Sequence, residues 1–329
     1  MRFTHHPIQS VKYKVRNGMT PNDTFYELIR QYAAGDLDSA AASAASIAGQ
    51  GELYAQAARW LARTAQDGPI GAYLDAKAFQ AFVDSDSNRA MYARLESMVA
   101  AAWDERRPAR ILDIGPGDGR VILGALRRAG QSGRRLRPAP AFDLVEPAAN
   151  LLSKALEGLG RHAPGVRVQG FNDAVQKFVE RAPANAAWDV CQATWSLQNL
   201  APGERAPLFR WLRGRCRCLL VAEFDVHSEA YPLLSSERVR LIHDRYVAGL
   251  TEVTGRMDRG LEERIKQGFL MPILFGYFRT DARRSTYEQT IQDWMAEIEA
   301  AGFAGARREL IYPYWWADAY LVTADAADE

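Results

Sequence analysis

The chain has 329 residues, 48% of them hydrophobic and 25% charged, and its formal net charge is +1. This length suits one large domain or two ordinary ones, and the composition is typical of a globular protein. The charge argues against a dominant nucleic-acid surface, and no apolar stretch approaches the ~20 residues that span a bilayer. The polar N-terminus lacks the apolar core of a signal peptide, and three cysteines are too few for a disulfide framework. We therefore expect a cytoplasmic protein without membrane spans.

The first third of the chain has the pattern of helices. Thr20 is a candidate N-cap with Pro21 in the first turn, and Gly35 ends this first helix. A later helix carries apolar residues at helical spacing between positions 53 and 61. We expect residues 1–105 to form an N-terminal helical cap or lid.

From Arg110 onward, short apolar strands alternate with helices. We expect strands at 110–113, 141–146, 166–169, 188–192 and 217–224, with helices at 119–129, 147–160, 173–181 and 202–213. After an interruption, a helix at 287–301 and strands at about 305–312 and 317–323 close the chain. This alternation predicts a doubly wound parallel α/β sheet built from right-handed crossovers. The predicted core spans 106–226 and 286–329, and residues 227–285 form a helical insert that acts as a substrate lid.

A glycine-rich loop, ILDIGPGDGR, follows the first predicted strand. Glycines allow a ligand to approach the backbone, and the following helix offers free N–H groups. The loop lacks the Gly-Lys-Ser/Thr of a P-loop, and Arg120 stands where the dinucleotide fingerprint has glycine or alanine. Asp113, just inside the strand, suits a cationic amine or sulfonium better than a pyrophosphate.

The stretch LDIGPGDG resembles motif I of class I S-adenosylmethionine-dependent methyltransferases, and the segments that follow extend the resemblance. FDLVEP ends the second strand at Glu146, which matches the acid that binds the cofactor ribose. In VQGFNDA, Asp173 matches the acid that contacts the adenine amino group. In WDVCQATWSL, Gln192 and Thr194 match the segment beneath the methionine part. The resemblance implies a seven-stranded sheet in the order 3-2-1-4-5-7-6, with the last strand antiparallel.

The resemblance also implies the cofactor, S-adenosyl-L-methionine, its product S-adenosyl-L-homocysteine, and a set of binding residues. This set consists of Asp113, Gly115, Pro116, Gly117, Gly119, Glu146, Pro147, Asp173, Ala174, Gln192 and Thr194, together with Tyr73 and Asn88 from helices that fold over the cofactor. Structural roles are the alternative for the acids, because a carboxylate also braces loops and favours helix N-termini. No metal-ligand pattern is evident in the sequence.

The methyl acceptor is less well defined. Near the end of the fifth strand, Glu223, Asp225 and His227 lie at the edge where ligands bind in such sheets, and His227 is the candidate general base. The alternative is a histidine that only packs at the surface. The fourth strand lacks the Asn/Asp-Pro-Pro-Tyr/Phe motif that is associated with methylation of adenine or glutamine nitrogen. The apolar run 269–278 fits either a substrate pocket or a helical core.

Three functions stay open at this point. The first is methyl transfer to a small molecule or modified peptide in specialised natural-product metabolism, by in-line displacement in an enclosed pocket. The second is an RNA or protein methyltransferase that uses the basic loop Arg127–Arg137, although the net charge disfavours a nucleic-acid partner. The third is a non-catalytic cofactor-binding scaffold. A homodimer is compatible with all three.

Overall fold

The computed structural model describes residues 19–68, 75–131, 139–254, 257–279 and 286–326. The chain divides into two compact units. The helical unit combines Met1–Phe82 with Leu233–Asp281, and the sheet unit combines Val83–Pro232 with Ala282–Glu329. Two segments far apart in the sequence, the N-terminal helices and the insert, therefore share one core.

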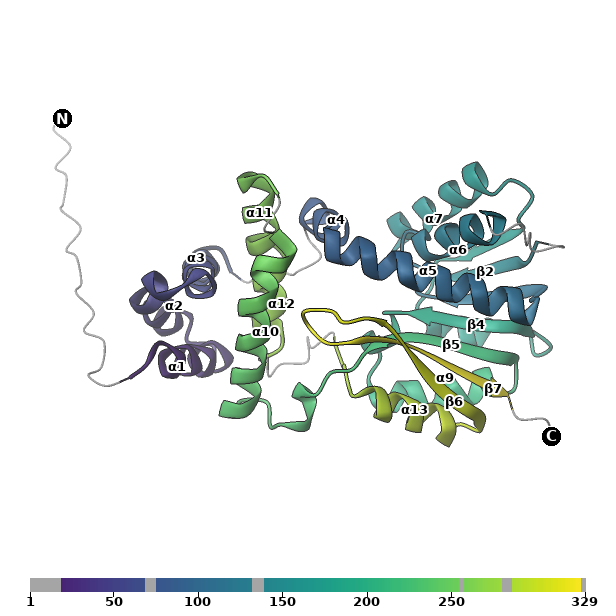
Figure 1. The fold of residues 1–329 in the computed structure, drawn as a ribbon. Coiled ribbons are helices and arrows are strands. Elements are labelled where there is room, and N and C mark those ends of the chain that lie inside the picture. Colours follow the sequence, from purple (N-terminus) through teal and green to yellow (C-terminus); the bar gives the residue numbers. More distant parts are fainter. Residues whose placement is uncertain (1–18, 69–74, 132–138, 255–256, 280–285, 327–329) are drawn as a thin grey trace, which may run out of the picture. The chain divides into compact units, whose positions relative to one another are not determined.

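In the described part of the sheet unit, one sheet contains seven strands in the order β3-β2-β1-β4-β5-β7-β6 (Figure 1). The strands are β1 (Arg110–Ile114), β2 (Ala141–Val145), β3 (Val168–Phe171), β4 (Trp188–Thr194), β5 (Cys216–Phe224), β6 (Phe303–Tyr312) and β7 (Ala319–Ala326). The first five pair in parallel, and β7 runs antiparallel to both of its neighbours. This confirms the predicted strand order and the predicted direction of the last strand.

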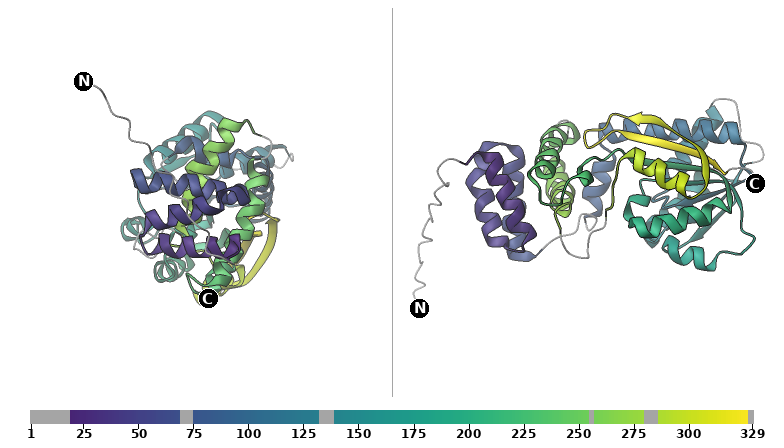
Figure 2. Two further views of the ribbon diagram at one scale, coloured as in Figure 1. Left: turned by 90° about the vertical axis from the view of Figure 1, so that its left-hand side faces the viewer. Right: turned by 90° about the horizontal axis from the view of Figure 1, so that it is seen from below.

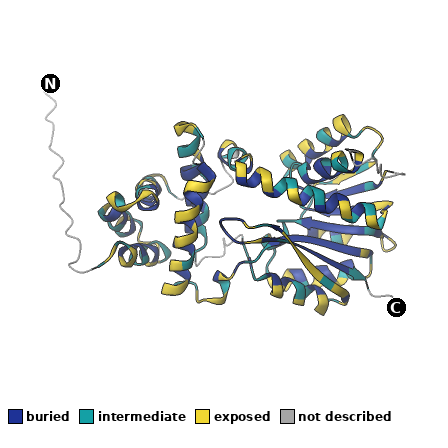
Figure 3. Cartoon of the chain, in the orientation of Figure 1, coloured by how far each residue is buried: buried dark blue, intermediate teal, exposed yellow. Residues whose placement is uncertain are grey.

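Helices pack on both faces of this sheet. They are α5 (Asp86–Arg106), α6 (Arg120–Gln131), α7 (Ala149–His162), α8 (Val175–Arg181), α9 (Pro202–Arg213) and α13 (Ile291–Ala300). Alternate side chains of a strand point to opposite faces. Cys191 and Ala193 accordingly join a core cluster with side chains of α8, α9 and α13, whereas Gln192 meets Trp103 of α5. Strands β1, β2, β4, β5 and β7 are largely buried between these layers, whereas the edge strands β3 and β6 are mostly exposed or half-buried (Figure 3).

One unit assignment and several element boundaries differ from the predictions. Helix α5 belongs to the sheet unit, whereas the sequence pattern placed its residues in the N-terminal cap. Strand β3 lies two residues later than predicted, because Gly165, with φ +101°, and a hydrogen bond from Val166 N to Ala163 O hold the preceding residues in a turn. Helix α13 begins at Ile291, because the Thr290 hydroxyl accepts a hydrogen bond from the Asp293 backbone.

The helical unit is built around two groups of helices. These are α1 (Pro21–Ala33), α2 (Leu37–Ile47) and α3 (Glu52–Asp67), which lie side by side in Figure 2, and α10 (Ser236–Thr254), α11 (Arg259–Ile265) and α12 (Met271–Gly276); α4 (Ala76–Val83) ends at the boundary of the unit. Thr20 caps α1 as predicted. The apolar run 269–278 is core here: Phe275 stacks on Trp60, with ring centroids 4.5 Å apart.

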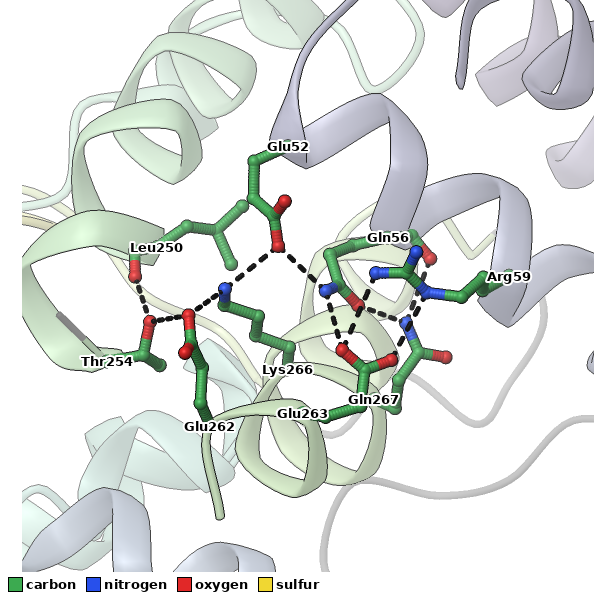
Figure 4. A network of polar contacts seen from close by, with 9 residues as sticks. All are labelled: Glu52, Gln56, Arg59, Leu250, Thr254, Glu262, Glu263, Lys266 and Gln267. Atoms are coloured by element: carbon green, nitrogen blue, oxygen red, sulfur yellow. Dashed lines mark hydrogen bonds and ion pairs between the residues drawn. The ribbon is translucent and has the colours of Figure 1, made fainter. Parts of the chain in front are cut away.

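A polar network joins α3 to the segment after α10 in the helical unit (Figure 4). Lys266 begins a π-helical turn, Lys266–Leu270, and its side chain is only 6% exposed. Its ammonium group forms ion pairs with Glu52, at 2.8 Å, and with Glu262. Gln56 donates hydrogen bonds of 2.9 Å to Glu52 and to Glu263. The buried cation is thus compensated by two carboxylates from different parts of the chain.

Candidate functional site

The glycine loop joins β1 to α6. Gly115, Gly117 and Gly119 have φ values of +70°, +59° and +76°, a region that side chains other than glycine enter at a cost. A Cβ atom on Gly115 would lie 2.4 Å from the Cβ of Ser196, so the loop packs tightly against the turn after β4. A Cβ atom on Gly117 would meet no atom within 4 Å. Position 117 therefore faces open space, as a ligand-binding backbone requires.

Asp113 lies in β1 just before this loop and is buried. Its Oδ2 accepts a hydrogen bond of 2.5 Å from the Gln192 side chain, whose Oε1 in turn accepts from Trp103 Nε1 at 3.2 Å. Oδ1 of Asp113 is buried and has no hydrogen-bond partner among the described residues. Burial raises the pKa of Asp113 to about 7, the bond from Gln192 opposes the rise, and the charge of Glu146 adds to it.

Burying a carboxylate oxygen without a hydrogen-bond partner costs free energy. Asp113 is therefore poised to accept a hydrogen bond from a donor group of a ligand. A cationic donor fits best, because it also compensates the carboxylate charge. Gln192 uses both ends of its amide on Asp113 and Trp103, which makes it a positioning residue for the Asp113 carboxylate. Its predicted contact with the cofactor stays a prediction.

Glu146 directly follows β2 and is also buried. Its Oε2 accepts a hydrogen bond of 3.1 Å from the backbone N–H of Gly117, and its Oε1 accepts one of 2.9 Å from Ala148. Asn172 holds the same loop, donating to the carbonyl oxygens of Glu146 and Pro147 at 3.0 Å each. Each carboxylate oxygen of Glu146 keeps a second lone pair for a ligand hydroxyl.

Asp173 and Ala174 follow β3. The Asp173 carboxylate pairs with Arg181 at 3.1 Å, and Ala174 is the N-cap residue of α8. The ion pair gives Asp173 a structural role besides the predicted contact with adenine. The exposed pairing with Arg181 is weak enough to be shared with a ligand.

The remaining predicted cofactor residues have less distinctive surroundings. Thr194 is the last residue of β4, Pro116 is buried in the glycine loop, and Pro147 is exposed. Asn88 is buried in the first turn of α5 and donates to Ser85 Oγ at 3.0 Å. Tyr73 lies outside the described residues, so the predicted lid contact from it has no structural description.

His227 follows the end of β5, and its side chain is 65% exposed. Its Nε2 lies 3.3 Å from Oδ2 of Asp225, whose Oδ1 accepts a hydrogen bond from the backbone of Ile291. Asp225 is thereby fixed beside the imidazole. This arrangement is compatible with proton transfer, and the role of His227 as a base stays a prediction.

The sequence pattern did not reveal Trp103, Asn172 or Trp195 as neighbours of the site. Trp103 is separated from Gln192 by 89 positions, and nothing in its local sequence signals the contact. Asn172 stands beside Asp173, and the polar pair after a predicted strand was the available signal. Among the described residues, two that are not glycine have positive φ, Arg107 at +49° and Trp195 at +52°. A strained residue at the end of a strand is a feature that only the backbone reveals.

No protein-family model matches this sequence, and no curated protein does. Among solved structures, SCL7 of Oryza sativa matches with a TM-score of 0.65 at 12% identity, over 93% of this chain and all of that one. The magnesium protoporphyrin IX methyltransferase of Synechocystis PCC 6803, with bound S-adenosylmethionine, matches with a TM-score of 0.48 at 10% identity, over 78% of this chain and 93% of that one. An O-methyltransferase family protein of Burkholderia thailandensis matches with a TM-score of 0.43 at 14% identity, over 72% and 58%.

The observed strand order decides the fold. The parallel strands β1 to β5, the reversal of their order between β1 and β4, and the antiparallel β7 all follow the predicted order. The chain has the class I methyltransferase fold. In this fold the glycine loop, Asp113 and Glu146 share the carboxyl edge of the parallel strands, where open α/β sheets bind ligands.

The remaining sequence features concern metal sites, membrane helices, the cysteines and the basic loop. Within the described ranges, no group of three or more His, Cys, Asp or Glu side chains has the arrangement of a metal site, and no helix is long and apolar enough to cross a membrane. All three cysteines are buried as free thiols. Most of the basic loop Arg127–Arg137 lies outside the described residues, and Arg128, at its start, pairs with Glu96 at 3.2 Å.

Proposed function

We propose that this protein is an enzyme, an S-adenosylmethionine-dependent methyltransferase. The observation that carries the proposal is the buried Oδ1 of Asp113, which has no partner among the described residues and precedes the open position at Gly117. The α-ammonium group of this cofactor supplies the cationic donor that Asp113 needs. The pyrophosphate of a dinucleotide would instead bring negative charge toward the same carboxylate.

Each residue of the edge then has a role toward the cofactor. Asp113 would bind the ammonium group, with Gln192 fixing the orientation of its carboxylate. Glu146 would accept hydrogen bonds from the ribose hydroxyls, and Asp173 from the adenine amino group. When bound, the cofactor supplies a methyl group that is already activated by a positively charged sulfur. The protein mainly aligns the acceptor and takes up its proton.

The acceptor is proposed to be a small molecule or a modified peptide of specialised metabolism, methylated in the cytoplasm. The support is the helical unit, which has a core of its own and is built from the two segments outside the sheet. For proton uptake we propose His227. The Asp225 carboxylate lies 3.3 Å from Nε2, so we propose Nδ1 as the nitrogen that takes the proton of the acceptor.

Calorimetric titration of the full chain tests the cofactor assignment. We expect S-adenosylhomocysteine to bind with micromolar affinity and NADH, in a parallel cell, not to bind. Binding of NADH alone would replace methyl transfer by hydride transfer as the function. Binding of neither compound would overturn the cofactor assignment.

The proposed base has its own test. The His227→Ala variant should lose turnover, by about 10²-fold for a missing general base, with unchanged affinity for S-adenosylhomocysteine. The change should leave stability within about 0.5 kcal/mol, because the side chain is exposed. Normal methyl transfer by this variant would remove His227 from the mechanism.

A further inference from the structure

The turn after β4, residues 195–198, lies directly against the glycine loop. The hydroxyl of Ser196 donates a hydrogen bond of 2.6 Å to the carbonyl oxygen of Ile114, the last residue of β1. Gly115 approaches the same serine so closely that no side chain fits between them. β4 is also the strand beside β1 in the sheet. The turn therefore borders the loop that our proposed function assigns to the methyl donor.

The backbone of this turn is strained and firmly anchored. Trp195 has φ +52°, which a bulky residue adopts only when its surroundings impose it. Its N–H donates to Ala222 O at 2.8 Å. Further along the turn, the N–H groups of Leu197 and Gln198 both donate to Oε1 of the buried Glu223, at 3.1 and 3.2 Å. These bonds hold Trp195 in one orientation, and such outliers concentrate at binding sites.

The indole of Trp195 contacts two aromatic rings from other elements, and one of them, Phe224, also stacks with Tyr314 at 5.6 Å. The ring of Tyr92, from α5, meets the indole edge-on at 4.9 Å, and Phe224, at the end of β5, stacks with the indole at 5.8 Å. The side chains of the aromatic group Tyr92, Trp195 and Phe224 are partly exposed. Nε1 of Trp195 is buried and has no hydrogen-bond partner among the described residues, so the accessible part of this indole is hydrocarbon.

The guanidinium group that contacts Tyr92 is already paired with carboxylates. The guanidinium of Arg120 lies over Tyr92, 5.1 Å from the ring centroid. It forms ion pairs with Asp118 at 2.8 Å and with Asp84 at 3.4 Å. The aromatic group thus offers apolar ring surface rather than a charge to a ligand.

We propose that Trp195 is a specificity-determining residue of the acceptor site and that it selects a planar, apolar acceptor, which lies against the group Tyr92, Trp195 and Phe224. The proposal rests on the proposed methyl-donor site, because the adjacent turn and glycine loop place this ring surface beside it. Flat hydrocarbon ligands gain from aromatic walls through both area burial and ring stacking.

The test uses 2-naphthol as a planar probe and cyclohexanol as its non-planar control, titrated into full-length protein with saturating S-adenosylhomocysteine. Two variants separate the ring from the backbone strain. Trp195→Phe keeps a planar ring, whereas Trp195→Asn removes the ring and tolerates positive φ. We expect 2-naphthol to bind wild type and Trp195→Phe within a few-fold of each other. Trp195→Asn should bind it at least tenfold more weakly, with unchanged affinity for S-adenosylhomocysteine.

Other results overturn the inference. Equal binding of 2-naphthol to all three proteins, or no preference over cyclohexanol in wild type, would show that Trp195 does not select planar acceptors. Loss of S-adenosylhomocysteine affinity in Trp195→Asn would move Trp195 into the donor site. If wild type binds no S-adenosylhomocysteine, the proposed function fails. The titration with S-adenosylhomocysteine alone therefore distinguishes failure of the proposed function from failure of this inference.

A second measurement does not depend on a variant without the ring. Wild-type protein labelled with 5-fluorotryptophan has a ¹⁹F resonance for Trp195, which Trp195→Phe identifies by its loss. Addition of 2-naphthol should shift this resonance, and cyclohexanol should not. A Trp195 resonance that 2-naphthol leaves unmoved would overturn the inference even if Trp195→Asn failed to fold.

Discussion

Glu146 accepts a hydrogen bond from the backbone N–H of Gly117, with Oε2 and N 3.1 Å apart. This bond joins the acid after β2 to the middle glycine of the loop after β1. The same carboxylate also accepts from Ala148, so it braces two loops at once. A residue that the sequence pattern assigned to ligand binding therefore also shapes the loop that would hold the ligand.

Replacing Glu146 should weaken cofactor binding in two steps. Glu146→Gln keeps one oxygen for the Gly117 N–H and loses the other acceptor, and we expect about tenfold weaker binding of S-adenosylhomocysteine. Glu146→Ala removes both acceptors and should cost on the order of 1–3 kcal/mol of binding free energy. Calorimetric titration measures both, with Glu309→Ala as the control, because Glu309 of β6 has a side chain that is 64% exposed. Unchanged affinity in Glu146→Ala would remove Glu146 from the site.

Gly117→Val should block the site and leave the fold intact. A side chain at this position would enter open space, so the expected loss of stability comes only from the positive φ and is about 1–2 kcal/mol. Gly35→Val is a matched control, because Gly35 also has positive φ, +82°, and open space around its Cβ position. The two variants should melt at similar temperatures, and only Gly117→Val should lose S-adenosylhomocysteine binding. Normal binding of S-adenosylhomocysteine by Gly117→Val would show that the cofactor pocket does not lie at this loop.

Binding of a cationic ligand to Asp113 should depend on pH. Its pKa of about 7 lies above the ordinary 3.8, so the free protein holds a proton on Asp113 below pH 7. An ammonium group needs the carboxylate, so binding must expel this proton, and affinity for S-adenosylhomocysteine should fall by up to tenfold per pH unit below 7. Titration between pH 5.5 and 8.5, in buffers of different ionisation enthalpy, measures both the affinity and the proton release.

The free energy of unfolding of the ligand-free protein should also depend on the protonation of Asp113, and it should fall as the pH rises. The unfolded chain releases the Asp113 proton near pH 3.8 and the folded chain near pH 7, so this group lowers the free energy of unfolding as the pH rises through that window. Asp113→Asn should remove that contribution and the pH dependence of binding together. A variant that kept the full pH dependence of binding would assign it to another group.

How far the sequence predicts this molecule depends on the range of each interaction. The glycine loop and the alternation of strands and helices are local patterns, and the family resemblance that they carry implied the strand order and the role of Glu146. The hydrogen bond between Trp103 and Gln192 spans 89 positions, and helical periodicity alone could not assign α5 to the sheet unit. The run 269–278 was ambiguous for a similar reason, because apolar residues suit a pocket and a core equally until Phe275 is seen against Trp60.

Lys266 in the helical unit should contribute more to stability than a neighbouring cation at the surface (Figure 4). Its side chain is 6% exposed, and hydrogen bonds from its ammonium to Glu262 and Glu52 outweigh burial and raise its pKa. Lys266→Met leaves the two carboxylates without their shared cation, so we expect a loss of about 1–3 kcal/mol in the free energy of unfolding, discounted for the partial exposure of both acids.

Arg59→Ala is the control: Arg59 pairs with Glu263 but is 52% exposed, and its loss should stay within about 0.5 kcal/mol. Urea unfolding measures both variants, and hydrogen exchange in α3 and α11 should report the weakening locally. Equal effects of the two substitutions would show that the buried ion pairs add nothing beyond surface charge.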